Sequence, residues 1–223
     1  MRPLLRRTLF AATAAYLALS LPLALLLLRS EYFRIVTAAE VTRKLSHVSP
    51  MEAVFCGDSH TAAIPDWGGR LGLRPFSTLN LAIPGLYVYQ VRDQVQRALL
   101  LPTRRIVVMA GTNDLRDHRR TDADILADWQ SILRLETSGA APRRIVVSIP
   151  LQGDTALDPR IAALNLQLRT VALNAGWEFL DLNARFTSTQ VPRTDLFTDG
   201  IHFSETTYRL WIEELAPAFQ PGR

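Results

Sequence analysis

The chain has little of several residue types that define common classes of protein. Only one of its 223 residues is cysteine, Cys56, and four are histidine. A single cysteine cannot form a disulfide within the chain, so no disulfide framework supports the fold. The sequence also lacks internal repeats, low-complexity segments and any long basic run with interleaved aromatic residues. The net charge of +4 comes from scattered arginines, and we therefore expect no nucleic-acid partner.

Charge is also absent from one long N-terminal segment. Leu9–Leu28 is a run of twenty uncharged residues, nine of them Leu and six Ala. At ~1.5 Å per residue such a helix spans roughly 30 Å, the hydrocarbon thickness of a bilayer. Arg2, Arg6 and Arg7 precede the run and form the basic flank that stays in the cytoplasm. The segment therefore predicts a single-pass membrane anchor, with the rest of the chain on the periplasmic or extracytoplasmic side.

A cleaved signal peptide and a buried core helix are the competing interpretations of this segment. The apolar region of a signal peptide usually has about 7–15 residues and ends at a small-x-small cleavage site. Here the block is longer, and the candidate site Thr37-Ala38-Ala39 lies about ten residues beyond it. We expect residues 1–29 to be the basic flank and transmembrane signal-anchor. Residues 30–50 would then be a juxtamembrane connector and residues 51–223 a single enzyme domain.

Beyond Pro50 short apolar runs alternate with amphipathic stretches of helical periodicity. Such alternation is typical of βαβ units with a parallel sheet covered on both faces. It predicts a three-layer α/β/α, flavodoxin-like sandwich around a central five-stranded parallel sheet. The expected strands are Ala53–Cys56, Ser77–Leu81, Ile106–Ala110, Ile145–Ile149 and Glu178–Leu182, and the expected helices are Val88–Leu101, Asp122–Leu135, Pro159–Asn174 and Glu205–Phe219.

Polar clusters stand where these predicted elements begin or end. Gly57-Asp58-Ser59 follows the first strand, Asn80–Gly85 the second, Gly111–Asp114 the third, and Asp199–His202 precedes the last helix. The carboxyl ends of parallel strands share one edge of a sheet, and open α/β sheets bind their ligands there. We therefore expect these four clusters to converge.

The four clusters resemble, in order, the four sequence blocks of the SGNH (GDSL-like) hydrolases. The resemblance covers about residues 52–220 and rests on Gly57-Asp58-Ser59, Gly85, Gly111-x-Asn113-Asp114 and Asp199-x-x-His202. The chain departs from the common pattern at His60, where the family name expects Leu, and at Ala82, where Gly often stands.

The resemblance implies a Ser-His-Asp triad for acyl transfer. Ser59 would be the nucleophile, His202 its general base, and Asp199 the group that orients His202. His60 is a second imidazole beside Ser59. We expect His202 to be the base because it has its own carboxylate, and His60 to be a substrate contact or a surface residue.

The resemblance also implies an oxyanion hole and two supporting carboxylates. The donors would be the backbone N–H groups of Ser59 and Gly85 and the side-chain amide of Asn113. Asp58 and Asp114 are expected to be structural, accepting hydrogen bonds from backbone amides of the loops that carry Ser59 and Asn113. No cofactor and no metal is expected.

Together these features predict a membrane-anchored serine esterase that removes small acyl groups from an ester-bearing small molecule or envelope glycan. O-acetyl groups of cell-envelope polysaccharide are the first candidate substrate, and lipid esters or thioesters the second. An O-acyltransferase with the same triad and a non-catalytic glycan- or partner-binding domain remain alternatives. A two-metal phosphoesterase would need more histidine ligands than the chain offers. Asp199 and His202 could also be only a cap for the last helix.

Overall fold

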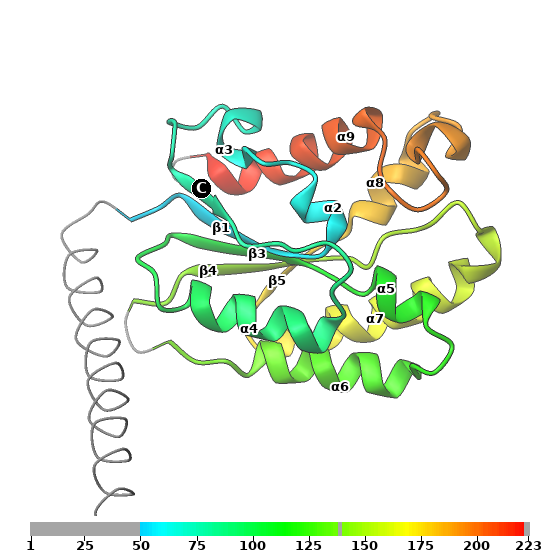
Figure 1. Ribbon diagram of the computed structural model, residues 1–223, viewed down its shortest axis with the longest axis horizontal. Helices are drawn as coiled ribbons and strands as arrows, with labels where there is room; N and C mark the ends of the chain where they lie inside the picture. The colour runs from blue at the N-terminus through cyan, green and yellow to red at the C-terminus, as the bar shows by residue number, and fades with distance from the viewer. Residues whose placement is uncertain (1–49, 138–139, 221–223) are drawn as a thin grey trace, which may run out of the picture. The chain divides into compact units, whose positions relative to one another are not determined.

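Five parallel strands form one sheet in the order β2-β1-β3-β4-β5, with helices on both faces (Figure 1). The computed structural model describes residues 50–137 and 140–220. The strands are β1 Ala53–Gly57, β2 Thr78–Asn80, β3 Arg105–Met109, β4 Arg143–Val147 and β5 Glu178–Leu180. The expected α/β fold with a five-stranded parallel sheet is thereby confirmed.

Helices cover both faces of the sheet, which is why its central strands are apolar without alternation. All of β1 is buried, as are four of the five residues of β3. One face packs against α4 Val88–Ala98, α6 Asp122–Leu133 and α7 Asp158–Asn174. The other packs against α3 Trp67–Arg70, α8 Leu182–Ser188 and α9 Glu205–Leu215 (Figure 1).

The expected long helices are present, with ends shifted by a few residues. α9 ends at Leu215 and continues as a 3₁₀ turn over Ala216–Phe219, because Pro217 cannot donate to the helical ladder. The sequence did not predict the short helices α2 Ser59–Ala62, α3, α5 Thr112–Arg116 and α8, or the 3₁₀ turns Thr155–Leu157 and Arg193–Leu196. Segments of three to seven residues are too short to reveal a helical period.

The predicted membrane anchor, and the predicted connector up to residue 49, lie outside the described residues. Within residues 50–137 and 140–220, no helix is both long enough and apolar enough to cross a bilayer.

Two buried side-chain amides hold the carboxyl ends of strands in place. Gln94 of α4 accepts a hydrogen bond from the Gly57 N–H (2.7 Å) and donates one to the Gly57 carbonyl (3.1 Å). Asn165 of α7 bonds both backbone groups of Ile149, each at 2.8 Å. The helices thereby satisfy backbone groups at the point where each chain segment leaves the sheet. Nothing in the helical periodicity predicted either role.

We expect Gln94→Leu to destabilise the domain by about 1–3 kcal/mol. The substitution leaves the buried N–H of Gly57 without a partner, and an unsatisfied buried group costs about 1–3 kcal/mol, whereas the Gly57 carbonyl keeps its hydrogen bond from the Ile83 N–H. Urea unfolding followed by circular dichroism would measure the loss. Gln96→Leu, at an exposed position of the same helix, is the matched control and should change stability by less than about 0.5 kcal/mol. Equal effects of the two substitutions would contradict the role of Gln94.

Candidate active site

The first polar cluster forms a tight turn from β1 into α2. A side chain at Gly57 would collide with the Met109 carbonyl and with the Thr61 hydroxyl, which would lie 2.5 Å from the added Cβ. Only glycine therefore allows β1 to end this close to β3. Asp58 caps α2 by accepting a hydrogen bond from the His60 N–H (3.1 Å). Ser59 is the first residue of α2 and is partly exposed at the carboxyl edge of the sheet.

The cluster Asp199–His202 forms a compact loop in front of α9. Asp199 Oδ1 accepts hydrogen bonds from the N–H groups of Ile201 (3.0 Å) and His202 (2.8 Å). Asp199 Oδ2 lies 2.7 Å from His202 Nδ1. The His202 ring and these two amides hold the pKa of the Asp199 carboxyl well below its usual range. An ionised carboxylate can only accept, so Nδ1 carries the ring proton and the basic lone pair of a neutral ring is on Nε2.

The loop does not serve as the cap of α9. That role belongs to Ser204, whose side chain accepts a hydrogen bond from the Thr207 N–H. The interpretation of Asp199 and His202 as a helix cap is therefore wrong.

Aromatic contacts join the loop that carries His202 to α2, the helix that begins at Ser59. The ring centroids of His60 and His202 are 5.9 Å apart in an edge-to-face arrangement. Phe203 lies 4.3 Å from the His60 ring, and the Tyr208 hydroxyl donates to the His60 carbonyl (2.9 Å). Residues about 140 positions apart in the sequence thus meet beside Ser59.

His60 is buried, with no exposed surface, so its expected place at the surface or against the substrate is wrong. Phe203 and α9 cover it. Neither ring nitrogen has a hydrogen-bond partner among the described residues. Burial, reinforced by the nearby His202, lowers the pKa of His60 to about 3. A neutral ring beneath His202 adds no positive charge that would oppose protonation of His202.

Two of the expected oxyanion residues adjoin one another: Gly85 on the loop before α4 and Asn113 in α5. Gly85 has φ +80° and is exposed. The Asn113 side-chain amide donates one hydrogen bond to the Leu86 carbonyl (2.9 Å), and its second N–H has no partner among residues 50–137 and 140–220. The Ile83 N–H donates to the Gly57 carbonyl (3.1 Å) and brings this loop to the end of β1. In the part of the chain that the structure describes, no hydrogen bond occupies the N–H of Ser59 or of Gly85.

Asp114 binds a different backbone amide from the expected one. It accepts hydrogen bonds from the Val88 N–H (3.0 Å), at the start of α4, and from Arg120. Burial raises the pKa of Asp114, against the stabilising effect of these donors. The carboxylate thus joins α5, which carries Asn113, to the helix that follows Gly85.

Asn80 is a structural residue of the second cluster. Its amide donates to the carbonyls of Thr61 and Ile64, both at 2.9 Å, and its oxygen accepts from the Ala82 N–H (3.0 Å). It therefore ties the loop that leads to Gly85 to the chain just after α2.

Gly153 is a residue of the site that sequence reasoning missed. Its N–H donates to the Gly200 carbonyl (2.6 Å). A Cβ at Gly153 would stand 2.8 Å from Gly200 Cα. Arg193 fixes this loop by binding the Gln152 carbonyl and the Asp158 carboxylate. The loop after β4 therefore supports the loop of Asp199 and His202 through a contact that leaves no room for a side chain.

Within residues 50–137 and 140–220, no three His, Cys, Asp or Glu side chains are grouped as metal ligands would be. His118, which a two-metal site would need, is exposed on the loop after α5.

Known proteins resemble this chain in sequence and in fold. Residues 55–210 match the model of the GDSL-like Lipase/Acylhydrolase family. No match was found among curated protein sequences.

Solved structures share the fold at low sequence identity. A lipase/acylhydrolase from Enterococcus faecalis is 20% identical with a TM-score of 0.61, covering 77% of this chain and 98% of its own. An acetylxylan esterase from Geobacillus stearothermophilus is 16% identical with a TM-score of 0.65, and the match covers 78% and 96% of the two chains. A member of the lipolytic G-D-S-L family from Veillonella parvula is 22% identical with a TM-score of 0.64, and the coverage is 77% and 100%.

We expect Gly153→Ala to lower kcat for hydrolysis of an aryl acetate by about 10–100-fold. The added methyl group must push the Gly200 backbone away, and a displacement of about 1 Å in a reacting group can cost roughly 10²-fold. Thr155→Ala, in the same loop, is the control and should leave kcat unchanged. The melting temperatures of both variants would verify folding. A folded Gly153→Ala protein with full kcat would contradict the positioning role.

We expect Asp58→Asn to gain stability relative to the parent as the pH rises. Burial raises the pKa of Asp58 to about 7, whereas an unfolded Asp titrates near 3.9. Between these values only the folded state holds the proton, so the stability of the parent falls as the pH rises towards 7.

Asn keeps the capping oxygen and cannot ionise. The difference in unfolding free energy between variant and parent, measured in urea at pH 5 and pH 8, should therefore increase by on the order of 2 kcal/mol. The contribution of His60 is common to both proteins and cancels. A difference that does not change with pH would mean that Asp58 stays ionised in the folded state.

Proposed function

The chain belongs to the GDSL-like lipase/acylhydrolase family, and from this premise we propose that it is a serine esterase that removes small acyl groups through Ser59, His202 and Asp199. The family makes the chain an ester hydrolase. The assignment of roles to individual residues, the location in the membrane and the substrate are our proposal.

One observation carries the assignment of roles. His202 Nδ1 lies 2.7 Å from Asp199 Oδ2, and the His202 ring packs edge-to-face on His60, the residue after Ser59. The carboxylate thus fixes the ring with Nε2 free, beside the helix that begins at Ser59. A nucleophile, an adjacent base and a group that orients the base are the parts that acyl transfer needs.

In the proposed reaction Ser59 Oγ attacks the ester carbonyl carbon while His202 Nε2 takes the hydroxyl proton. Asp199 stabilises the imidazolium that forms. The negative charge that develops on the carbonyl oxygen accepts hydrogen bonds from the Ser59 and Gly85 N–H groups and the free N–H of Asn113. Each such donor is typically worth about 3–4 kcal/mol in the transition state.

Collapse of this intermediate breaks the bond to the alcohol, which leaves with the proton from His202. Ser59 then carries the acyl group. A water molecule, deprotonated by His202, attacks the acyl-enzyme, and release of the carboxylic acid restores the Ser59 hydroxyl. Attack by a sugar hydroxyl in place of water would give an O-acyltransferase through the same covalent intermediate.

We expect Ser59→Ala to lower kcat/KM for an aryl acetate by at least about 10³-fold, since the nucleophile is lost and only binding and oxyanion stabilisation remain. The assay uses the full-length chain purified in a mild detergent. Ser188→Ala, at an exposed position of α8, is the matched control and should retain full activity.

Other outcomes separate the alternatives. Equal activity of the parent and Ser59→Ala would refute the assignment of the nucleophile. A parent that releases the phenol only when a sugar acceptor is added would identify an acyltransferase. An inactive parent with either acceptor would favour a binding domain.

We further propose that Leu9–Leu28 anchors the enzyme in the cell membrane with residues 51–223 on the outer side. The support is the length of this uncharged block and the basic flank before it. An enzyme held there meets envelope polysaccharide, so O-acetyl groups on such a polymer are the first candidate substrate and lipid esters or thioesters the second.

If the anchor is retained, the protein recovered from membranes should have the intact mass of the full chain and should resist extraction at alkaline pH. A shorter chain that begins after Ala39 would instead show a cleaved signal peptide. Mass spectrometry of the protein purified from membrane and soluble fractions distinguishes the two.

A further inference from the structure

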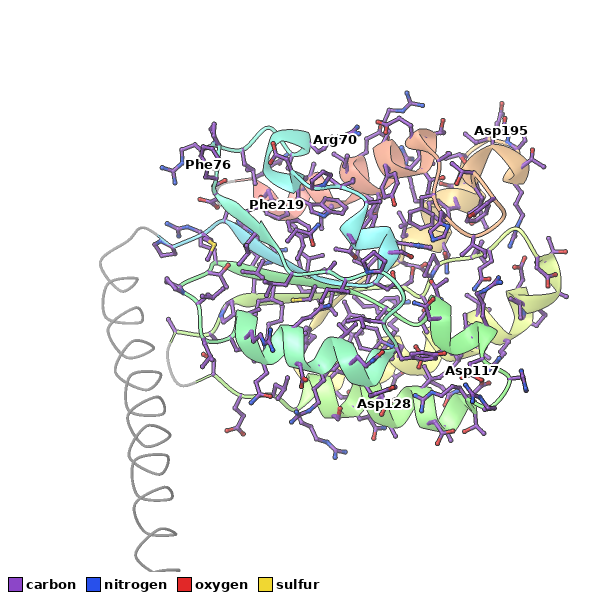
Figure 2. All side chains as sticks on the ribbon, in the orientation of Figure 1. Arg70, Phe76, Asp117, Asp128, Asp195 and Phe219 are labelled. Atoms are coloured by element: carbon purple, nitrogen blue, oxygen red, sulfur yellow. The ribbon has the colours of Figure 1, made fainter. Side chains whose placement is uncertain are left out.

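A groove of about 470 Å³ adjoins the two expected oxyanion residues that lie outside α2. Its lining residues come from the loop before α4 and from α5 with the segment that follows it: Gly85, Tyr87, Asn113, Arg116, Asp117, His118 and Arg119. Any molecule whose ester carbonyl reaches Gly85 and Asn113 must place part of itself over this groove. Asp117, one of the lining residues, is labelled in Figure 2 and shows where the groove lies.

The charge of the groove is not balanced. The Asp117 carboxylate accepts two hydrogen bonds of 2.9 Å from the Arg119 guanidinium, one from the Arg119 backbone N–H (3.0 Å) and one from the Tyr87 hydroxyl (3.3 Å). The Arg119 guanidinium holds the pKa of the Asp117 carboxyl well below its usual range, so this pair is neutral overall. Arg116 is exposed and has no hydrogen bond or ion pair with any described residue. One full positive charge therefore remains in the groove.

The position of Arg116 ties this charge to the reaction. Arg116 is the last residue of α5 and follows Asn113 by three positions. Residues three apart lie on the same face of a helix, with about 5–6 Å between their Cβ atoms. The arginine therefore stands within one helical turn of the amide expected to hold the carbonyl oxygen. A planar guanidinium at this place is suited to a carboxylate, which it can bind through two parallel hydrogen bonds.

The groove also has a rigid wall. Tyr87 stacks on Tyr89 with ring centroids 5.9 Å apart, and its hydroxyl is bound to Asp117. The Asp114 carboxylate, buried and bound to Val88, fixes α5 against α4. The backbone position of Arg116 relative to Gly85 is thus set by packing and not by the substrate.

We propose that Arg116 selects esters whose alcohol portion carries a carboxylate close to the acylated oxygen. The inference rests on the proposed function, in which the acyl group is small and so leaves the charged group on the alcohol. On a polysaccharide, the matching chemistry is an O-acylated sugar acid.

The test compares two acetates, 4-acetoxybenzoate and its neutral methyl ester, methyl 4-acetoxybenzoate. They differ in charge, in one methyl group and in the acidity of the phenol, and the last two differences are the same for every variant. Acetate release by the full-length protein gives kcat/KM for each. The ratio to compare is kcat/KM for the anionic ester divided by kcat/KM for the neutral ester. Arg116→Gln should lower this ratio about fivefold relative to the parent, mainly by raising KM for the anionic ester. The value of kcat/KM for the neutral ester should change by less than about twofold. High salt should reduce the ratio in the parent, because it screens the attraction.

Arg134→Gln is the matched control, since it removes the same charge from an exposed position at the end of α6. It should leave the ratio unchanged. An equal ratio in the parent, Arg116→Gln and Arg134→Gln, with both esters hydrolysed, would overturn the inference and leave the proposed function intact.

A binding measurement keeps the inference testable without turnover. The Ser59→Ala protein should bind 4-acetoxybenzoate more tightly than the methyl ester by calorimetry, and addition of Arg116→Gln should abolish the preference. If the parent hydrolyses neither ester, the proposed function fails. If Ser59→Ala shows no preference for the anion, the selection by Arg116 fails.

Discussion

The whole architecture depends on burial of a parallel sheet on both faces. The buried strands are a source of stability because their apolar side chains leave water on both sides. At the carboxyl edge, buried backbone N–H and C=O groups lie beyond the last bonds between strands and need other hydrogen-bond partners. The side-chain amide of Gln94 bonds these groups at Gly57, the last residue of β1, and that of Asn165 bonds them at Ile149, just after β4. The turn at Gly57 leads directly to Ser59, and the loop after β4 supports the loop of Asp199 and His202 through Gly153.

Close backbone contacts, more than side-chain contacts, set the geometry of the site. Gly57 lets β1 turn against Met109, and Gly153 lets the loop after β4 touch Gly200. Each contact would be lost with the addition of one methyl group. Arg193 and Asn80 then hold the loops through carbonyl oxygens. In the described part of the chain, loops arranged in this way present Ser59, Asp199 and His202 beside an open groove, without a lid or a second domain.

The sequence predicted the strands and the order of the polar clusters because both depend on local signals. A continuous apolar run such as Ala53–Cys56 can only be a buried strand or a short piece of core, and the glycine after it marks the end of that element. The blocks that resemble a known family then indicated which strand ends carry chemistry. The convergence of Asp199 and His202 on the helix of Ser59 followed from the rule for parallel sheets.

What the sequence could not predict depends on contacts between distant segments. His60 is expected to be a substrate contact or a surface residue, yet Phe203 covers it from more than 140 positions away. The polar face of a helix gave no sign that Gln94 binds Gly57, and nothing around Gly153 marks it as the partner of Gly200. Short helices such as α2 and α5 begin at caps that are ambiguous with turns. Arg116 is one of several polar residues that follow Asn113, and only the structure shows that it lines the groove.

A covalent acyl-enzyme on Ser59 is the central claim, and trapping it is the most direct test. The full-length protein would be mixed with an aryl acetate, quenched in acid within milliseconds to seconds, digested, and mapped by mass spectrometry. The account predicts an acetyl group on the peptide that contains Ser59, and none on that peptide in Ser59→Ala. An acetyl group found on another side chain, or turnover without any acylated peptide while Ser59→Ala remains active, would contradict it.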